Sequence, residues 1–191
     1  MRVAVAITGA SGIPLALRTI DVLLNMKINV EVALSKDAIE VSKIEPCFVD
    51  PPISCNIVDE IRKRGLSPQI SMTSHLASSS RVPDAVVVVP CSMKTLGMIA
   101  HGIGSTLPSR LALNAIRMGK KTVLVPRESP VGPLELENML KLSKIGVHIV
   151  LPTLAFYIKP KSISDIIDFI VGKILDVLGI DHNLYQRYYP H

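Results

Sequence analysis

The sequence contains few aromatic residues and few cysteines: aromatic side chains make up 4% of its 191 residues, and there are only three cysteines. Proteins that bind single-stranded nucleic acid stack the bases on aromatic rings. This scarcity therefore argues against a nucleic-acid partner, although the net charge is +5. Cys47, Cys55 and Cys91 are widely spaced and include no C-x-x-C pair. Neither a zinc site nor a disulfide framework is expected, and a small anionic ligand explains the positive charge better.

The sequence also lacks a long apolar run. Hydrophobic residues make up 48% of the chain and charged residues 19%, with a mean hydropathy of +0.40. Even so, no segment approaches the roughly 18 consecutive apolar residues that a membrane span requires. The first residues enter a strand without the basic, apolar and cleavage regions of a signal peptide. We expect a cytoplasmic protein with no membrane association, a sheet buried on both faces and extensive contacts between subunits.

The apolar run from Val86 to Val89 is the most informative segment. Four valines followed by Pro90 predict a short strand buried on both faces, as in the centre of a parallel sheet. Ser92 then stands at the N-cap position of a helix. Lys94, in the first turn, opposes the helix dipole unless a negative group lies beside it, so it either faces an anion or points to water. Such a corner between strand and helix is typical of a ligand crevice.

Helices and strands alternate along the chain, which predicts an α/β fold: a three-layer Rossmann-like (flavodoxin-like) sandwich with a mainly parallel sheet. Further strands are expected at 2–8, 30–34, 121–125 and 147–151, and helices after Pro14 and at 37–44, 57–64, 108–118, 134–145 and 162–178. Residues 46–54 are predicted to form a Pro-rich loop and residues 65–83 an irregular stretch. Residues 1–178 form a single domain in this interpretation, and the tail 179–191 packs on a neighbour or over the site.

Polar residues follow several of the predicted strands. The loop Gly9-Ala10-Ser11-Gly12 follows the first strand but lacks the G-x-G-x-x-G spacing, which weakens an NAD-type interpretation. Its Ser11 either bonds a phosphate or a flavin edge, or caps the next helix. Ser35 ends the second strand, and Arg127 and Glu128 together follow a later one. By themselves, these two charged residues predict only an exposed ion pair.

Four parts of the sequence resemble the UbiX-type flavin prenyltransferases: ITGASG, VVVPCSMKTL with IAHGI, LVPRESP with LELENMLKLSKIG, and FYIKPKSISDIIDFIVGKILDVLGI. They occur in the family's order and extend from Val3 to about Tyr188, with a weak stretch at 46–82. The resemblance implies a site for flavin mononucleotide (FMN) and transfer of a dimethylallyl group from dimethylallyl phosphate to N5, then C6, of reduced FMN. It also implies a homododecamer whose product, prenylated FMN, serves as a cofactor for UbiD-type decarboxylases.

The resemblance also implies which residues meet the flavin. They are small or polar residues close to the predicted strand ends: Gly9, Ala10, Ser11, Ser35, Ser92, Met93, Lys94, Thr95 and Arg127. Ser11 and Glu128 would form the proton-transfer pair. Glu45, which by itself indicates only a solvated helix end, would join the catalytic residues.

A second implied group of residues meets the prenyl donor. Tyr157 and Lys173 would hold the phosphate, and Arg110 and Arg117 would contribute, with Glu45, from around a subunit interface. Such a reaction needs cations to bind the leaving phosphate and a nearby acid to protonate it. Prenyl pyrophosphate enzymes usually employ Mg²⁺ on a D-D-x-x-D motif, which this sequence lacks. We therefore expect a metal-independent reaction of a monophosphate.

Three other classes of protein remain as alternatives. An FMN-dependent cysteine decarboxylase of the same superfamily would carry a P-x-M-N string where this chain has Pro126-Arg127-Glu128, so the sequence argues against it. A flavin-binding module without catalysis would keep the corner at Ser92 as a structural feature and would not depend on Glu128. A nucleotide-dependent dehydrogenase is disfavoured by the missing glycine pattern.

Overall fold

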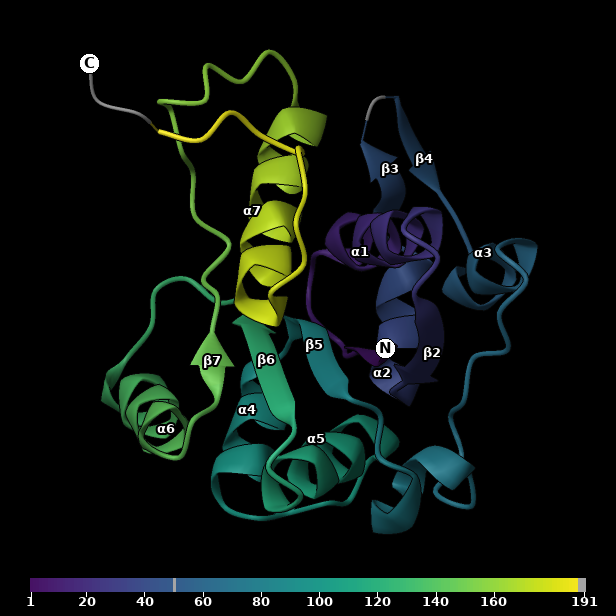
Figure 1. The fold of residues 1–191 in the computed structure, drawn as a ribbon. Coiled ribbons are helices and arrows are strands. Elements are labelled where there is room, and N and C mark those ends of the chain that lie inside the picture. Colours follow the sequence, from purple (N-terminus) through teal and green to yellow (C-terminus); the bar gives the residue numbers. More distant parts are fainter. Residues whose placement is uncertain (50, 189–191) are drawn as a thin grey trace.

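The computed structural model describes residues 1–49 and 51–188, and five of its strands form one parallel sheet (Figure 1). The strands of this sheet are β1 (Arg2–Ile7), β2 (Asn29–Leu34), β5 (Ala85–Cys91), β6 (Lys121–Pro126) and β7 (His148–Ile149). Their order is β2-β1-β5-β6-β7, and each neighbouring pair is parallel. The strand order reverses between β1 and β5, the point at which open α/β sheets bind ligands.

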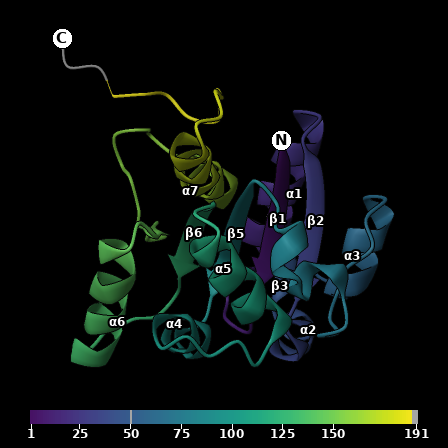
Figure 2. The same cartoon turned by 60° about the horizontal axis from the view of Figure 1, so that its bottom comes forward.

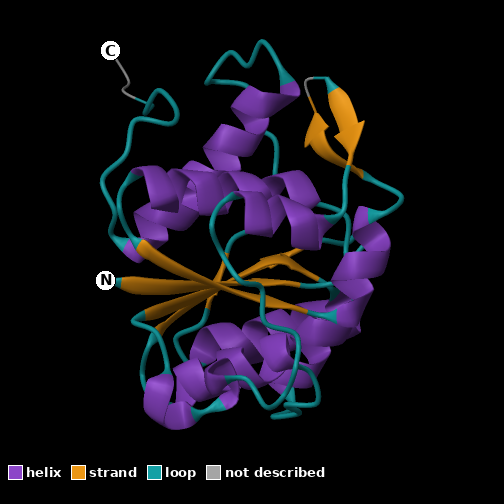
Figure 3. Ribbon diagram, turned by 90° about the vertical axis from the view of Figure 1, so that its right-hand side faces the viewer, coloured by secondary structure: helices purple, strands orange, loops and turns teal. Residues whose placement is uncertain are grey.

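Helices cover both faces of the sheet (Figure 3), which confirms the predicted three-layer α/β sandwich. α1 (Ile13–Asn25) and α7 (Ile163–Leu178) pack on one face together with α3 (Ile57–Lys63). α4 (Met93–Ala100), α5 (Leu107–Arg117) and α6 (Pro133–Lys144) pack on the other, so the strands lie between α7 and α4 (Figure 2). The short α2 (Lys36–Ser42) follows β2. None of the helices in the described part of the chain is long and apolar enough to cross a membrane.

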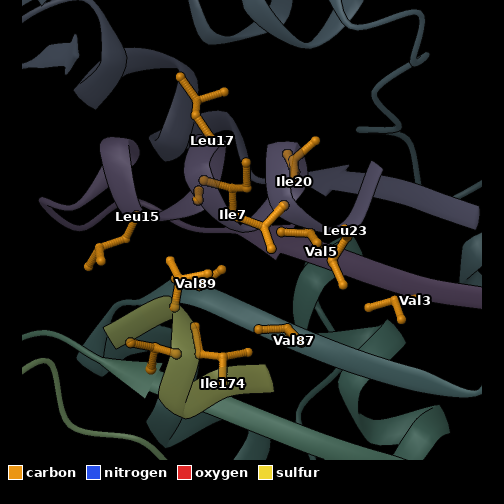
Figure 4. Packing of buried hydrophobic residues seen from close by; sticks show 14 of the residues in the cluster. Val3, Val5, Ile7, Leu15, Leu17, Ile20, Leu23, Val87, Val89 and Ile174 are labelled. Atoms are coloured by element: carbon orange, nitrogen blue, oxygen red, sulfur yellow. The ribbon is translucent and has the colours of Figure 1, made fainter. Parts of the chain in front are cut away.

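The core follows the alternation of side chains along the strands. Val87 and Val89 of β5 pack with Ile174 of α7 and the apolar side chains of α1 (Figure 4). Val86 and Val88 point to the other face and pack against the helices there. Every residue of β5 is buried, which confirms the prediction of a strand buried on both faces.

The end of the chain lies against α7. A Cβ on Gly172 would lie 2.5 Å from Cε1 of Tyr185, so the absence of a side chain at this helix position leaves room for the tail. Ile180, Leu184 and Tyr185 of the tail pack against the core cluster that includes α7 of the same chain, and residues 189–191 of the predicted tail lie outside the described residues.

Two predictions for residues 46–55 are wrong. The predicted loop is an antiparallel hairpin of β3 (Pro46–Val49) and β4 (Pro52–Ser54), which stands apart from the main sheet (Figure 3). Cys47 and Cys55 form a disulfide with a Cα–Cα distance of 5.7 Å, although no disulfide was expected from their spacing. The hairpin explains both errors, because it places two residues that are eight positions apart opposite each other. Cys91 is a buried free thiol, and burial raises its pKa to about 12.

We predict that the disulfide stabilises the protein by restricting the unfolded chain. Closing a loop of this length contributes about 2–3 kcal/mol in the chain-entropy model. A reducing agent should therefore lower the free energy of unfolding of the wild type by about that amount, as measured by denaturant titration. Cys55→Ser should have the lower stability from the start and should not respond to the reductant. An equal response of both proteins would contradict the prediction.

Candidate functional site

The topology brings most of the predicted flavin-binding residues to one edge of the sheet. The strands β2, β1, β5 and β6 are neighbours and parallel, so their carboxyl ends lie side by side. These ends carry the predicted residues in the loops or first helical turns that follow: Gly9, Ala10, Ser11, Ser35, Ser92, Met93, Lys94, Thr95, Arg127 and Glu128. The edge includes the point between β1 and β5 where the strand order reverses.

A cleft of about 640 Å³ opens at this edge beside β2. Small-molecule sites usually have volumes of about 300–1,000 Å³, so the cleft is large enough for a nucleotide-sized ligand. It is lined by two lysines, one aspartate and several hydroxyl groups together with apolar side chains: Leu34, Ser35, Lys36, Asp37, Ile70, Ser71, Met72, Lys94, Ser105, Thr106 and Leu107. Hydroxyl donors and a cation suit a phosphate and a polyol chain, so these residues fit FMN. Ser71, Ser105 and Thr106 were not among the predicted site residues.

Lys94 forms an ion pair with Asp37 across this cleft. Lys94 lies in the first turn of α4 and Asp37 in the first turn of α2. The negative group beside Lys94 is therefore a residue of the chain itself. Both side chains are at least half exposed, so water screens the pair and its net contribution is small. An anionic ligand in the cleft can therefore compete with Asp37 for Lys94.

Gly9 allows the loop after β1 to pass very close to α2. A Cβ at this position would lie 2.3 Å from Cβ of Asp37 and 3.1 Å from its carbonyl carbon. Because a contact of 2.3 Å is far below van der Waals distance, any larger residue must displace the first turn of α2. The position of Asp37, and with it the shape of the cleft, depends on glycine at position 9.

Thr8 joins the loops that follow β1 and β5. Its buried hydroxyl donates to the carbonyl oxygen of Pro90 at 2.8 Å and accepts from the backbone N–H of Ser92, also at 2.8 Å. The two bonds fix the corner at Ser92, whose own hydroxyl accepts from the N–H of Thr95 as the predicted N-cap of α4. From the sequence, Thr8 is predicted only as the last residue of a strand. The one feature that could have indicated its role is a polar side chain at the end of an otherwise apolar strand.

We predict that Thr8→Val weakens both the fold and flavin binding. The substitution keeps the shape of the side chain but leaves the N–H of Ser92 without its partner, which costs about 1–3 kcal/mol. Denaturant titration and a fluorescence titration with FMN measure the two effects. Thr19→Val is a matched control, because the buried hydroxyl of Thr19 bonds only the carbonyl of Leu15 within α1. Equal FMN affinities of the two variants would show that Thr8 does not support the site.

Glu45 caps α1 and is not simply a solvated helix end. Its Oε1 accepts from the backbone N–H groups of Gly12 at 2.9 Å and Ile13 at 2.7 Å. These donors have no partner within the helix and lie at its positive end, where a carboxylate is stabilised. The N-cap residue is Gly12, so Ser11 does not cap this helix. Ser11 and Glu45 instead line a pocket of about 320 Å³, together with Leu15 and other residues.

Tyr157 and Lys173 come together in a different pocket, of about 270 Å³, with three residues of the tail. The ring of Tyr157 makes edge contacts with Phe169, and the Lys173 Nζ lies 4.8 Å from the centroid of the Tyr185 ring. This pocket shares no lining residue with the cleft or with the pocket of Ser11. Within one chain, the residues predicted to hold the phosphate and the predicted proton-transfer residue Ser11 therefore line different pockets.

The remaining predicted residues stay separate. Arg110 and Arg117 lie on α5, on the face of the sheet opposite α7, and Arg117 donates to Oδ1 of Asn114 at 2.8 Å. Arg127 and Glu128 are exposed, and no ion pair joins them. Oε1 of Glu128 instead accepts from the N–H of Ser129 at 3.0 Å.

Comparison with known proteins assigns the chain to a family. The family model described as Flavoprotein matches residues 1–175, so the chain belongs to the flavoprotein family. The flavin prenyltransferase UbiX of Saccharolobus solfataricus is 42% identical over 191 residues, which cover 98% of this chain and 92% of the relative. Within the flavoproteins, the chain is therefore a member of the UbiX flavin prenyltransferases, which confirms the resemblance drawn from the four sequence strings.

Two solved structures share this fold over almost the whole length. AnUbiX in complex with FMN and dimethylallyl pyrophosphate has a TM-score of 0.88 at 33% identity, covering 100% of this chain and 98% of that chain. A dodecameric FMN-dependent UbiX-like decarboxylase from Escherichia coli O157:H7 has a TM-score of 0.86 at 34% identity, covering 100% of both chains.

Proposed function

We propose that this flavin prenyltransferase transfers the dimethylallyl group of dimethylallyl phosphate to reduced FMN and so produces prenylated FMN. The cleft of about 640 Å³ at the carboxyl ends of the strands carries the proposal, because its hydroxyl groups and Lys94 suit a flavin nucleotide. When bound, reduced FMN supplies N5 as the nucleophile and C6 for closure of the second ring. The residues that hold it in this proposal surround the strand ends: Gly9, Ala10, Ser11, Ser35, Ser92, Met93, Lys94, Thr95 and Arg127.

The prenyl donor requires cations and a proton donor from the chain. A carbon–oxygen bond breaks as the bond to the flavin forms, and the released phosphate carries away both bonding electrons. Lys173 and the hydroxyl of Tyr157 offer a charge and a hydrogen bond to this phosphate, which lowers the energy of the transition state. Glu128 and Ser11 transfer protons, and Glu45 holds the start of α1 beside Ser11. None of these roles requires a metal ion.

We further propose that subunits complete the site in a homododecamer. The separation of the Tyr157 pocket from the Ser11 pocket supports this, because a second copy can bring the two kinds of residue together. Large apolar side chains are exposed on α6 and before α7, including Leu134 and Phe156, with 72% and 75% of their surface accessible. The related enzyme from Escherichia coli O157:H7 is described as dodecameric. Arg110 and Arg117 would then act from around an interface.

The product, in this proposal, passes to a UbiD-type decarboxylase in the cytoplasm. The reaction is tested by incubating the protein without oxygen with reduced FMN and dimethylallyl phosphate, and by measuring inorganic phosphate. We expect phosphate release only when protein and reduced FMN are both present. With dimethylallyl pyrophosphate the leaving group is pyrophosphate, which is measured as phosphate after hydrolysis by a pyrophosphatase. Its release from that donor alone would leave the transferase assignment intact but overturn the monophosphate as the donor. No release from either donor would favour a flavin-binding module without catalysis.

A further inference from the structure

Asp176, near the end of α7, accepts hydrogen bonds from four side chains. Its Oδ2 accepts from the hydroxyl of Tyr185 at 2.6 Å and from Nζ of Lys173 at 3.3 Å. Its Oδ1 accepts from Nη2 of Arg187 at 2.8 Å and from Nε2 of His182 at 3.1 Å. Three of these donors belong to the tail that follows α7, and the fourth is the lysine predicted to hold the prenyl phosphate. One carboxylate therefore connects the tail to the phosphate pocket.

The surroundings of His182 and Gly172 show that the tail packs closely against α7. Nδ1 of His182 accepts from the N–H of Leu184 at 3.2 Å, so Nε2 carries the ring hydrogen and donates it to Asp176. The ring is buried, and a Cβ on Gly172 would lie 2.7 Å from its Cε1 atom. The tail can reach Asp176 only because α7 has no side chain at position 172.

The charges of the cluster leave a positive balance at the pocket. Burial alone would raise the pKa of Asp176, but the hydrogen bonds from Tyr185, Arg187, Lys173 and His182 lower it well below its usual range. The carboxylate is therefore ionised at neutral pH and offsets one of the two cations, Lys173 and Arg187. Both cations line the pocket of about 270 Å³ that Tyr157 and Tyr188 share with them.

We infer that Asp176 is a positioning residue for prenyl transfer, which holds Lys173 and Arg187 where they bind the phosphate of the donor. The inference rests on the proposed function, which places that phosphate beside Tyr157 and Lys173. It assigns Arg187 as a second cation toward the phosphate. Lys173 carries a point charge on a flexible side chain and has no fixed orientation toward the phosphate. The carboxylate of Asp176 restrains the ammonium group and so fixes its position.

Steady-state kinetics with dimethylallyl phosphate test the inference on the complete protein. Asp176→Asn should raise KM for the donor about tenfold, as expected for loss of hydrogen bonds to a charged group. The affinity for FMN should not change. If Asp176 acts through the cations, the increase in KM of the double variant Asp176→Asn/Lys173→Met should be smaller than the product of the increases of the two single variants. If the role of Asp176 were purely structural, the effects of the two substitutions would multiply in the double variant and KM would not change specifically. That result would overturn the inference.

Calorimetric binding of inorganic phosphate separates this inference from the proposed function, because it needs neither flavin nor donor. Asp176→Asn should bind phosphate more weakly than the wild type, and Tyr185→Phe should do so without any change of charge. Asp181→Asn, on an exposed residue of the same tail, is the control and should bind phosphate normally. If Asp176 acted only through its negative charge, Asp176→Asn would bind phosphate more tightly. That result, or equal binding by all variants, would overturn the inference even in a protein that transfers prenyl groups.

Discussion

Glu128→Gln should reduce the rate of prenyl transfer by about 10²- to 10⁴-fold, the usual contribution of a positioned general acid or base. The amide keeps the size of the side chain but neither donates the acidic proton nor accepts one in return. Glu128 is exposed and its carboxylate bonds the N–H of the next residue, so the substitution should leave the fold intact. The rate of phosphate release from dimethylallyl phosphate, with reduced FMN present and oxygen absent, measures the effect.

A control separates loss of catalysis from a general loss of charge. Glu137→Gln removes an exposed carboxylate from α6 and should leave the rate unchanged. Fluorescence titration should show that both variants bind FMN as tightly as the wild type. If Glu128→Gln retains the wild-type rate, Glu128 is not the acid of the reaction. If the wild type is also inactive, the protein binds flavin without this chemistry.

Gly9→Ala should reduce the affinity for FMN by about tenfold to a hundredfold. A Cβ at 2.3 Å from Cβ of Asp37 forces the first turn of α2 away from the loop, and overpacking of this kind costs about 1–3 kcal/mol. The displaced turn carries Ser35 and Asp37, which line the flavin cleft. Flavin fluorescence during titration measures the affinity, and denaturant titration measures the accompanying loss of stability.

Gly97→Ala is the matched control for Gly9→Ala. A Cβ at Gly97, within α4, would meet only Nδ2 of Asn138 at 3.8 Å, an ordinary contact. Alanine is favoured over glycine inside a helix, so this variant should be as stable as the wild type or more stable. Equal FMN affinities of the two variants would contradict the role given to the close approach at Gly9.

The sequence predicts the sheet and its helices because their signals are local. The valine run at 86–89, the N-cap serine Ser92 and the alternation of elements each depend on residues that are close together in the sequence. In a parallel sheet the carboxyl ends of the strands lie at one edge. The prediction of a parallel sheet is therefore enough to place the predicted flavin-binding residues together at that edge. β7 is shorter than expected, two residues in place of five, because only His148 and Ile149 pair with β6.

The contacts that shape the site depend on residues far apart in the sequence, which no local pattern predicts. Glu45 bonds N–H groups more than thirty positions earlier, and Thr8 bonds Pro90 and Ser92 more than eighty positions later. The ion pair of Asp37 with Lys94 likewise forms only when α2 and α4 begin at neighbouring strand ends. These contacts arise from the packing of the sheet. Resemblance to the family indicates Glu45 and Lys94 but none of their partners.

The mass of the flavin after reaction tests the central claim most directly. The protein is incubated without oxygen with reduced FMN and dimethylallyl phosphate, and the released flavin is weighed by mass spectrometry. We expect FMN that has gained one dimethylallyl unit, in an amount that falls to background in Glu128→Gln. FMN of unchanged mass, released from a protein that binds it tightly, would contradict the assignment as a flavin prenyltransferase acting on this donor.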